Sequence, residues 1–211
     1  MIAPVLFVFT TILGGALRPE YSHISETVSE LFSPESPNKL LLDTFHTTFA
    51  ILLVLFGIGI LRFVQRNEQS SLQGTTGAIL YIVMGLVSVT TATIFPQDAW
   101  GSPPTFPGEM HKIMSGVVGL FSMLSMILIG TWFIRTKIFP GFGTYSFVTV
   151  GVVILSTGFY IVTMGSPIMG LAERITILVG FMWTFILSYW MYSKRDMQME
   201  NHKKSELEKI K

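Results

Sequence analysis

Ionisable side chains that could do chemistry lie beside long apolar runs in this chain. His46 and His111, together with His23, could give nitrogen ligands to a zinc ion. Asp43 or Asp98 could give an oxygen ligand to the same ion. A catalytic zinc needs three protein ligands and an open position for water. The spacing does not support such a site, because the chain has no HExxH and no GxSxG motif.

The segment YSHISETVSELFSP, residues 21–34, adds two candidate general bases, Glu26 and Glu30. Read as a helix over residues 22–32, the segment has an apolar stripe and a separate polar stripe, and the prolines that follow would end it. The polar stripe faces water if the helix lies at the membrane interface, or a cleft if the helix is a lid. The apolar stripe comprises Ile24, Val28, Leu31 and Phe32, and the candidate ligand-binding polar cluster comprises Ser22, His23, Ser25, Ser29, Glu173 and Arg174.

Composition places these residues in a membrane protein. Half of the 211 residues are hydrophobic and only 13% are charged, whereas soluble domains carry about 25% charged residues. Too little polar surface remains to cover a water-soluble globule, so we expect a multi-pass membrane protein whose partners include membrane lipid.

Six apolar runs predict six transmembrane helices, because the runs are continuous and do not alternate as barrel strands do. The predicted fold class is all-α: an integral membrane bundle of six transmembrane helices, with a short amphipathic helix in the first outer loop. The spans are expected at about 2–17, 41–63, 74–95, 110–134, 145–164 and 171–192, followed by a charged cytoplasmic tail over 193–211.

The distribution of basic residues predicts the orientation. If there are six spans, both termini share one side of the membrane with the connections 64–73 and 135–144. That side carries Arg62, Arg66, Arg135, Lys137, Lys194, Arg195, Lys203, Lys204, Lys209 and Lys211, and the other side carries Arg18, Lys39, Lys112 and Arg174. We therefore expect both termini in the cytoplasm and the segment 21–34 outside the cell membrane.

Several classes of function are excluded. A net charge of +1 gives no reason to expect a nucleic-acid partner, and no phosphate-binding loop is present. The absence of cysteine excludes disulfides, thiol nucleophiles and thiolate metal sites.

Four motifs together resemble a known family. They are YSHISETVSEL after the first span, FPQD after the third span, a histidine at the head of the fourth span, and GLAER before the last. This combination is similar to a family of prokaryotic multi-span proteins catalogued as "domain of unknown function 998". The resemblance covers about residues 14–190. It implies an integral membrane protein of roughly six spans and no particular activity.

Three functions remain open. The first is a non-enzymatic module that binds a lipid or small amphiphilic ligand, or a membrane subunit. The second is a metal-dependent hydrolase or acyl-transfer enzyme at the outer leaflet, with zinc as its cofactor, and the third is a small-solute or ion transporter. For the first two we expect the 21–34 segment to close over a polar cluster of Asp43, His46, Asp98, His111 and Glu173, because unpaired charges beside hydrocarbon are costly.

Overall fold

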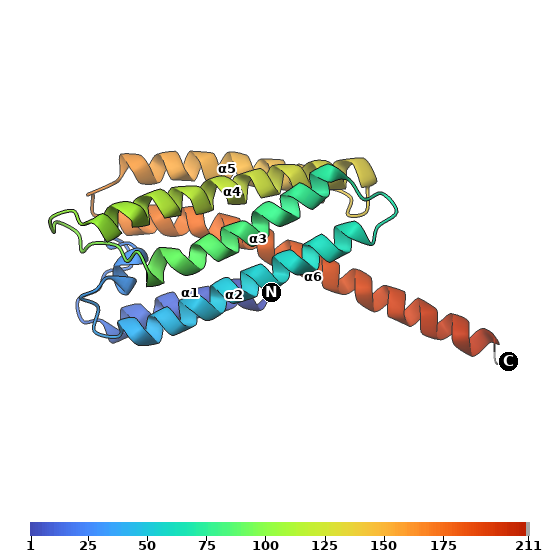
Figure 1. The fold of residues 1–211 in the computed structure, drawn as a ribbon, viewed down its shortest axis with the longest axis horizontal. Coiled ribbons are helices and arrows are strands. Elements are labelled where there is room, and N and C mark those ends of the chain that lie inside the picture. The colour runs from blue at the N-terminus through green and yellow to red at the C-terminus, as the bar shows by residue number, and fades with distance from the viewer. Residues whose placement is uncertain (210–211) are drawn as a thin grey trace.

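The computed structural model describes the backbone of residues 1–209 and the side chains of residues 1–193. This part of the chain is helical, with no strand, and its helices run up and down side by side (Figure 1). The elements are α1 (Ile2–Leu17), the short 3₁₀ helix η1 (Ser29–Phe32), α2 (Lys39–Gln65), α3 (Leu72–Thr93), α4 (Phe106–Thr136), α5 (Phe142–Val162) and α6 (Met169–Lys209).

Five helices, α2 to α6, are long and apolar enough to cross a membrane. This confirms the all-helical, multi-pass interpretation. α1 has 16 residues, which gives a length of about 24 Å against a hydrocarbon core of about 30 Å. α6 continues past the other helices to Lys209 (Figure 1), while the side chains of the expected charged tail after residue 193 lie outside the described residues.

Helices that follow one another in sequence are neighbours in space. Each of α2 to α5 packs on the helix before it and the helix after it, and α6 packs on α5. α1 packs mainly on α2 and touches α6 only lightly. The six helices therefore form a ring in chain order, and the weakest contact in the ring is the seam between α1 and α6.

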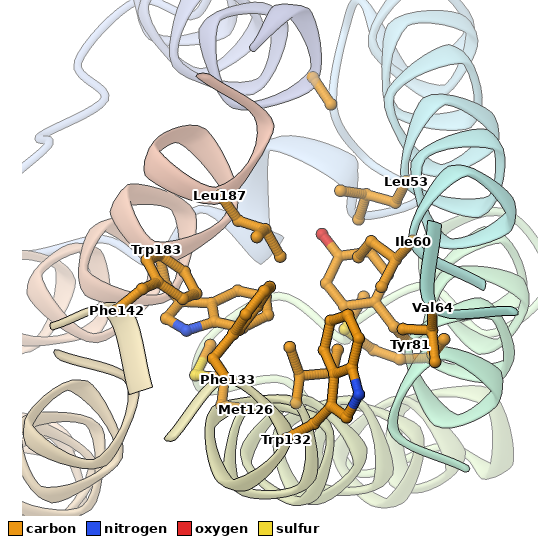
Figure 2. Packing of buried hydrophobic residues seen from close by; sticks show 14 of the residues in the cluster. Leu53, Ile60, Val64, Tyr81, Met126, Trp132, Phe133, Phe142, Trp183 and Leu187 are labelled. Atoms are coloured by element: carbon orange, nitrogen blue, oxygen red, sulfur yellow. The ribbon is translucent and has the colours of Figure 1, made fainter. Parts of the chain in front are cut away.

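Aromatic side chains fill the centre of the ring (Figure 2). Trp132, Trp183 and Tyr81 are almost fully buried there, and buried aromatic residues of this kind usually need a partner for their polar atom. The Tyr81 hydroxyl bonds the Thr184 hydroxyl at 2.9 Å, and the Trp183 ring N–H donates to Ser146 at 2.8 Å. The centre of the core is therefore packed and hydrogen-bonded.

Candidate functional site

One end of the ring is closed by the connection between α1 and α2, residues 18–38, which we call the cap. The cap is bound to the first turns of α6 through its backbone. The Leu171 N–H donates to the Ile24 carbonyl at 2.8 Å, and the Val28 N–H donates to the Glu173 carboxylate at 2.5 Å. The cap therefore spans from α1 and α2 across the seam to α6.

The prediction of an amphipathic helix over residues 22–32 is wrong. Turns occupy the first part of this segment, and only η1 at its end is helical. The Ser22 hydroxyl accepts the Ser25 N–H at 3.3 Å, and the Glu26 carboxylate accepts the Ser22 N–H at 2.7 Å. Serine and acidic side chains that bond nearby backbone in this way compete with helix formation.

The apolar residues of the cap are nevertheless buried, with one exception. Val28, Leu31 and Phe32 are 0–3% exposed, whereas Ile24 is 55% exposed. The buried three form a small hydrophobic cluster with Leu42 of α2 and Ala92 of α3. The expectation that the whole apolar stripe packs on the bundle thus holds for its second half, because the turn at Ile24 points that side chain outward.

Glu30 is buried inside the cap and stabilises its backbone. Its carboxylate accepts the Thr27 N–H at 2.8 Å and the Trp100 N–H at 3.3 Å. Glu26 lies nearer the surface and pairs with Arg18 at 3.6 Å. Both carboxylates hold local structure, and their role as general bases stays a prediction.

Arg174 joins α6 to the cap. Its Nη1 donates to the carbonyl oxygens of Glu26 at 2.8 Å and Gly170 at 2.9 Å. Its Nη2 donates to the Tyr21 hydroxyl at 2.5 Å and lies 3.3 Å from Nδ1 of His23. Its Nε is buried and has no partner.

Two titrating groups in the cap keep their neutral forms beside Arg174. Burial raises the pKa of Tyr21 well above its ordinary range. Burial and the neighbouring Arg174 charge lower the pKa of His23. A neutral His23 can accept from Arg174 through Nδ1, which fits the observed contact.

His46 and Asp43 lie on adjacent turns of α2 near the cap. His46 donates from Nε2 to the Ser88 carbonyl at 3.1 Å, and the rings of Phe32 and Phe49 pack against it. Asp43 pairs with Lys39 at 2.5 Å. One oxygen of Asp43 and Nδ1 of His46 are buried without a partner.

His111 and Asp98 take separate structural roles at the start of α4. His111 is buried, and its Nδ1 donates to the carbonyl oxygens of Thr91 at 2.9 Å and Phe95 at 2.8 Å. Asp98 accepts the Thr105 N–H at 2.9 Å and its hydroxyl at 2.6 Å, and these bonds lower the pKa of Asp98. Thr105 is in turn the N-cap of α4.

The candidate residues thus share one end of the ring, and most of them are hydrogen-bonded to backbone or to neighbouring side chains. Among the residues whose side chains are described, no three His, Asp or Glu side chains are placed to hold a metal ion. The zinc hypothesis gains no support from this arrangement. Thr90, Thr91 and Thr93 of α3 bond back to carbonyls of their own helix. Ser25 and Ser29 lie half-buried in the cap.

A cavity of about 190 Å³ lies at the seam between α1 and α6. Its walls are almost wholly apolar, and its polar lining residues at the cap are His23 and Arg174. Val8, Ile12 and Leu178 in its walls are 37–60% exposed, so the cavity opens sideways between the two helices. The other lining residues are Phe7, Thr11, Val28 and Ile177.

The sequence predicts His23 and Arg174 as members of a polar cluster, and it does not single out the residues of α1 or the other residues of α6 that line this cavity. The residues of α1 and α6 that line it look like ordinary lipid-facing residues in an apolar run. A signal was available in Thr11, a polar residue inside the first apolar run, but its hydroxyl bonds the Phe7 carbonyl at 3.0 Å. The choice of a seam between the first and last helices depends on the ring closure, which no local pattern encodes.

Comparisons with known proteins support the family resemblance and go no further. Comparison with the curated proteins and with the solved structures gives no match. One family profile matches residues 1–190, which is most of the chain. The chain belongs to the family described as "Protein of unknown function (DUF998)".

Proposed function

We propose that this protein is a non-enzymatic membrane module that binds one single-chain amphiphile in the seam between α1 and α6. The observation that carries the proposal is the apolar cavity that opens sideways and ends at His23 and Arg174. An amphiphile has the same division into an apolar chain and a polar head. The chain would lie along Val8 and Ile12, with the head beneath the cap.

The size of the cavity supports a single chain. Its volume is about 190 Å³, and a cavity of about 150 Å³ lined by Leu, Ile and Phe holds one benzene molecule. Several methylene groups of one chain therefore fit inside, and the rest of the chain would continue along the open side toward lipid. A drug-sized ligand needs roughly 300–1,000 Å³, so the seam does not suit a bulky soluble molecule.

Two further parts of the proposal concern the membrane. We infer that α1 crosses together with α2 to α6, giving six spans, and that both termini are cytoplasmic. The distribution of ten basic residues against four supports this orientation. With it, the cap and the polar end of the seam face the outer leaflet.

The metal-dependent hydrolase is the weaker candidate. A catalytic zinc needs three protein ligands, and no three His, Asp or Glu side chains among those described are placed to hold one ion. Glu30, a proposed general base, has both carboxylate oxygens on backbone N–H groups. These groups fix the packing of the cap end.

Photo-crosslinking tests the binding proposal. The purified protein in lipid nanodiscs is mixed with palmitic acid carrying a diazirine in its chain, irradiated and digested, and labelled peptides are mapped by mass spectrometry. We expect labels to concentrate on residues 7–12 and 177–178. The labels should fall severalfold in Val8→Trp, because the indole ring is larger than the valine side chain and fills the seam. Leu155→Trp is the matched control, because Leu155 is 75% exposed on α5, away from the seam. Labelling of α5 as strong as that of α1 and α6, with no effect of Val8→Trp, would show ordinary annular lipid instead.

A further inference from the structure

We propose that the amphiphile held in the seam carries a carboxylate head, which binds the guanidinium of Arg174. This inference rests on the proposed function and specifies its ligand. It starts from Arg174, a cation that lines an apolar cavity and is in none of the ion pairs found among residues 1–193.

Arg174 uses its hydrogen bonds on neutral acceptors. They are two backbone carbonyls, the Tyr21 hydroxyl and the His23 ring. Among residues 1–193 the ion pairs found are Arg18 with Glu26, Lys39 with Asp43, and Lys112 with Glu109, and Arg174 is in none of them. A cation near hydrocarbon is normally paired, so a missing anion is expected here.

The nearby carboxylates do not fill that place. Glu173 is next to Arg174 in sequence, but adjacent residues of a helix do not face each other. The Glu173 carboxylate accepts the Val28 N–H, and Glu30 is occupied by backbone N–H groups within the cap. Neither glutamate lines the cavity, whereas Arg174 does.

The donors that remain on Arg174 indicate a small head with one charge. A guanidinium has five N–H groups, and the four on Nη1 and Nη2 face the acceptors already named. The N–H on Nε is left, and this atom is buried without a partner. One free donor and one positive charge match one oxygen of a carboxylate, whereas a phosphate monoester carries about −1.5 to −2 and would leave charge uncompensated.

His23 adds a polar contact without adding charge. Its Nδ1 faces Arg174, so its proton is on Nε2, the nitrogen that lies over Gly15 of α1. Its ring therefore closes the polar end of the seam on the α1 side while Arg174 closes it on the α6 side. The head would lie between one cation and one neutral donor.

The test compares probes that have the same chain length and different heads, and it is done first on the unmodified protein. Diazirine probes of palmitic acid, hexadecanol and hexadecyl phosphate are titrated at pH 8, and the seam labels are quantified. We expect the carboxylate to bind about tenfold more tightly than the alcohol, as a charge-assisted hydrogen bond would give, and more tightly than the phosphate. In Arg174→Gln the preference for carboxylate over alcohol should fall to about one, while Arg135→Gln, a matched change at an exposed arginine of α4, should keep it.

The outcomes separate the two proposals. Equal labelling of the seam by acid and alcohol would overturn the carboxylate head and leave the binding of an amphiphile intact. Equal or tighter binding of the phosphate would also overturn the carboxylate assignment. Failure of every probe to label the seam would refute the proposed function itself. Because a misfolded Arg174→Gln would also label without a head preference, Arg174→Lys is the second variant. It loses the same guanidinium contacts and keeps the positive charge, so it should retain a preference for the carboxylate, and loss of the preference in both variants would contradict the proposal.

Discussion

Replacing Gly170 with alanine tests how the cap is held on α6. Gly170 lies in the first turn of α6 and is buried directly beneath the cap. A Cβ added there would overlap the carbonyl oxygen of Glu26, and it would lie 2.7 Å from the Glu26 carbonyl carbon and 2.8 Å from Nη1 of Arg174. The first two atoms are backbone, so the cap must move away from α6 to admit a methyl group.

The expected cost follows from what that movement breaks. Overpacking a well-packed site costs about 1–3 kcal/mol, and each hydrogen bond lost costs about 0.5–1.5 kcal/mol. The bonds at risk are Leu171 to Ile24 and Arg174 to Glu26. Alanine returns up to about 1 kcal/mol because it favours a helix over glycine. The net loss is about 3 kcal/mol, which lowers Tm by about 6–12 °C in a chain of this size.

Thermal unfolding in detergent, followed by tryptophan fluorescence, measures this loss. Trp100 reports on the cap end because its N–H donates to Glu30, and Trp183 reports on the core. Gly158→Ala is the control, since Gly158 is inside α5 and a Cβ there meets no atom within 4 Å. A Tm for Gly170→Ala within 2 °C or so of that control, on a scale of about 2–4 °C per kcal/mol, would refute the packing of the cap on α6.

Two other predictions concern charge and orientation. Because the pKa of His23 is lowered in the folded protein, its stabilising contribution is complete above about pH 6.5, the ordinary histidine value, and is lost as the pH falls below it. Between pH 7.5 and pH 5 the wild type should therefore lose more Tm than His23→Gln, and parallel losses would contradict this. A cysteine at exposed Ser102 should react with a membrane-impermeant thiol reagent in intact cells and one at exposed Ser70 should not, whereas the reverse pattern would invert the predicted orientation.

Much of the fold could be predicted from the sequence, because burial in a membrane is recorded along the chain itself. A transmembrane helix satisfies its own backbone hydrogen bonds and needs only a long apolar run. The expected span at 2–17 coincides with α1, and the one expected at 74–95 lies two residues from α3. The boundaries differ where a polar N-cap residue extends a helix. Thr105 is the N-cap residue of α4, which begins four residues before the expected start at residue 110.

The cap was predicted less well because two kinds of local information conflict there. Periodicity over residues 22–32 favours a helix, whereas Ser22 and Glu26 have short-range hydrogen bonds that favour turns. The turns are also stabilised by α6, because the Leu171 N–H donates to the Ile24 carbonyl. In a helix, that carbonyl would instead accept a hydrogen bond from the same segment. A partner so distant in sequence cannot be inferred from the segment alone.

The same reasoning explains why His46 and His111 are bonded to backbone carbonyls. Burial cost requires that each ionisable group near the apolar bundle find a partner, and it does not require that they find one another. Backbone carbonyls at the end of α3 are available partners, and His46 and His111 take them at Ser88 and Thr91. A shared metal site was therefore a sufficient solution to the problem of burial and not a necessary one.

The seam between α1 and α6 follows from the order of the helices. Each connection joins two successive helices, so five contacts of the ring are between helices adjacent in the chain, while the sixth joins the first helix to the last. α1 is also the shortest of the six helices. At the start of α1, the N-terminal amine donates to the Ser188 hydroxyl of α6 at 2.7 Å. Closer to the cap, Phe7 of α1 makes an edge-to-face contact with Phe181 of α6. At the other end the seam is held by the cap. Between these points an apolar cavity lies between the two helices, and the cap closes one end of it.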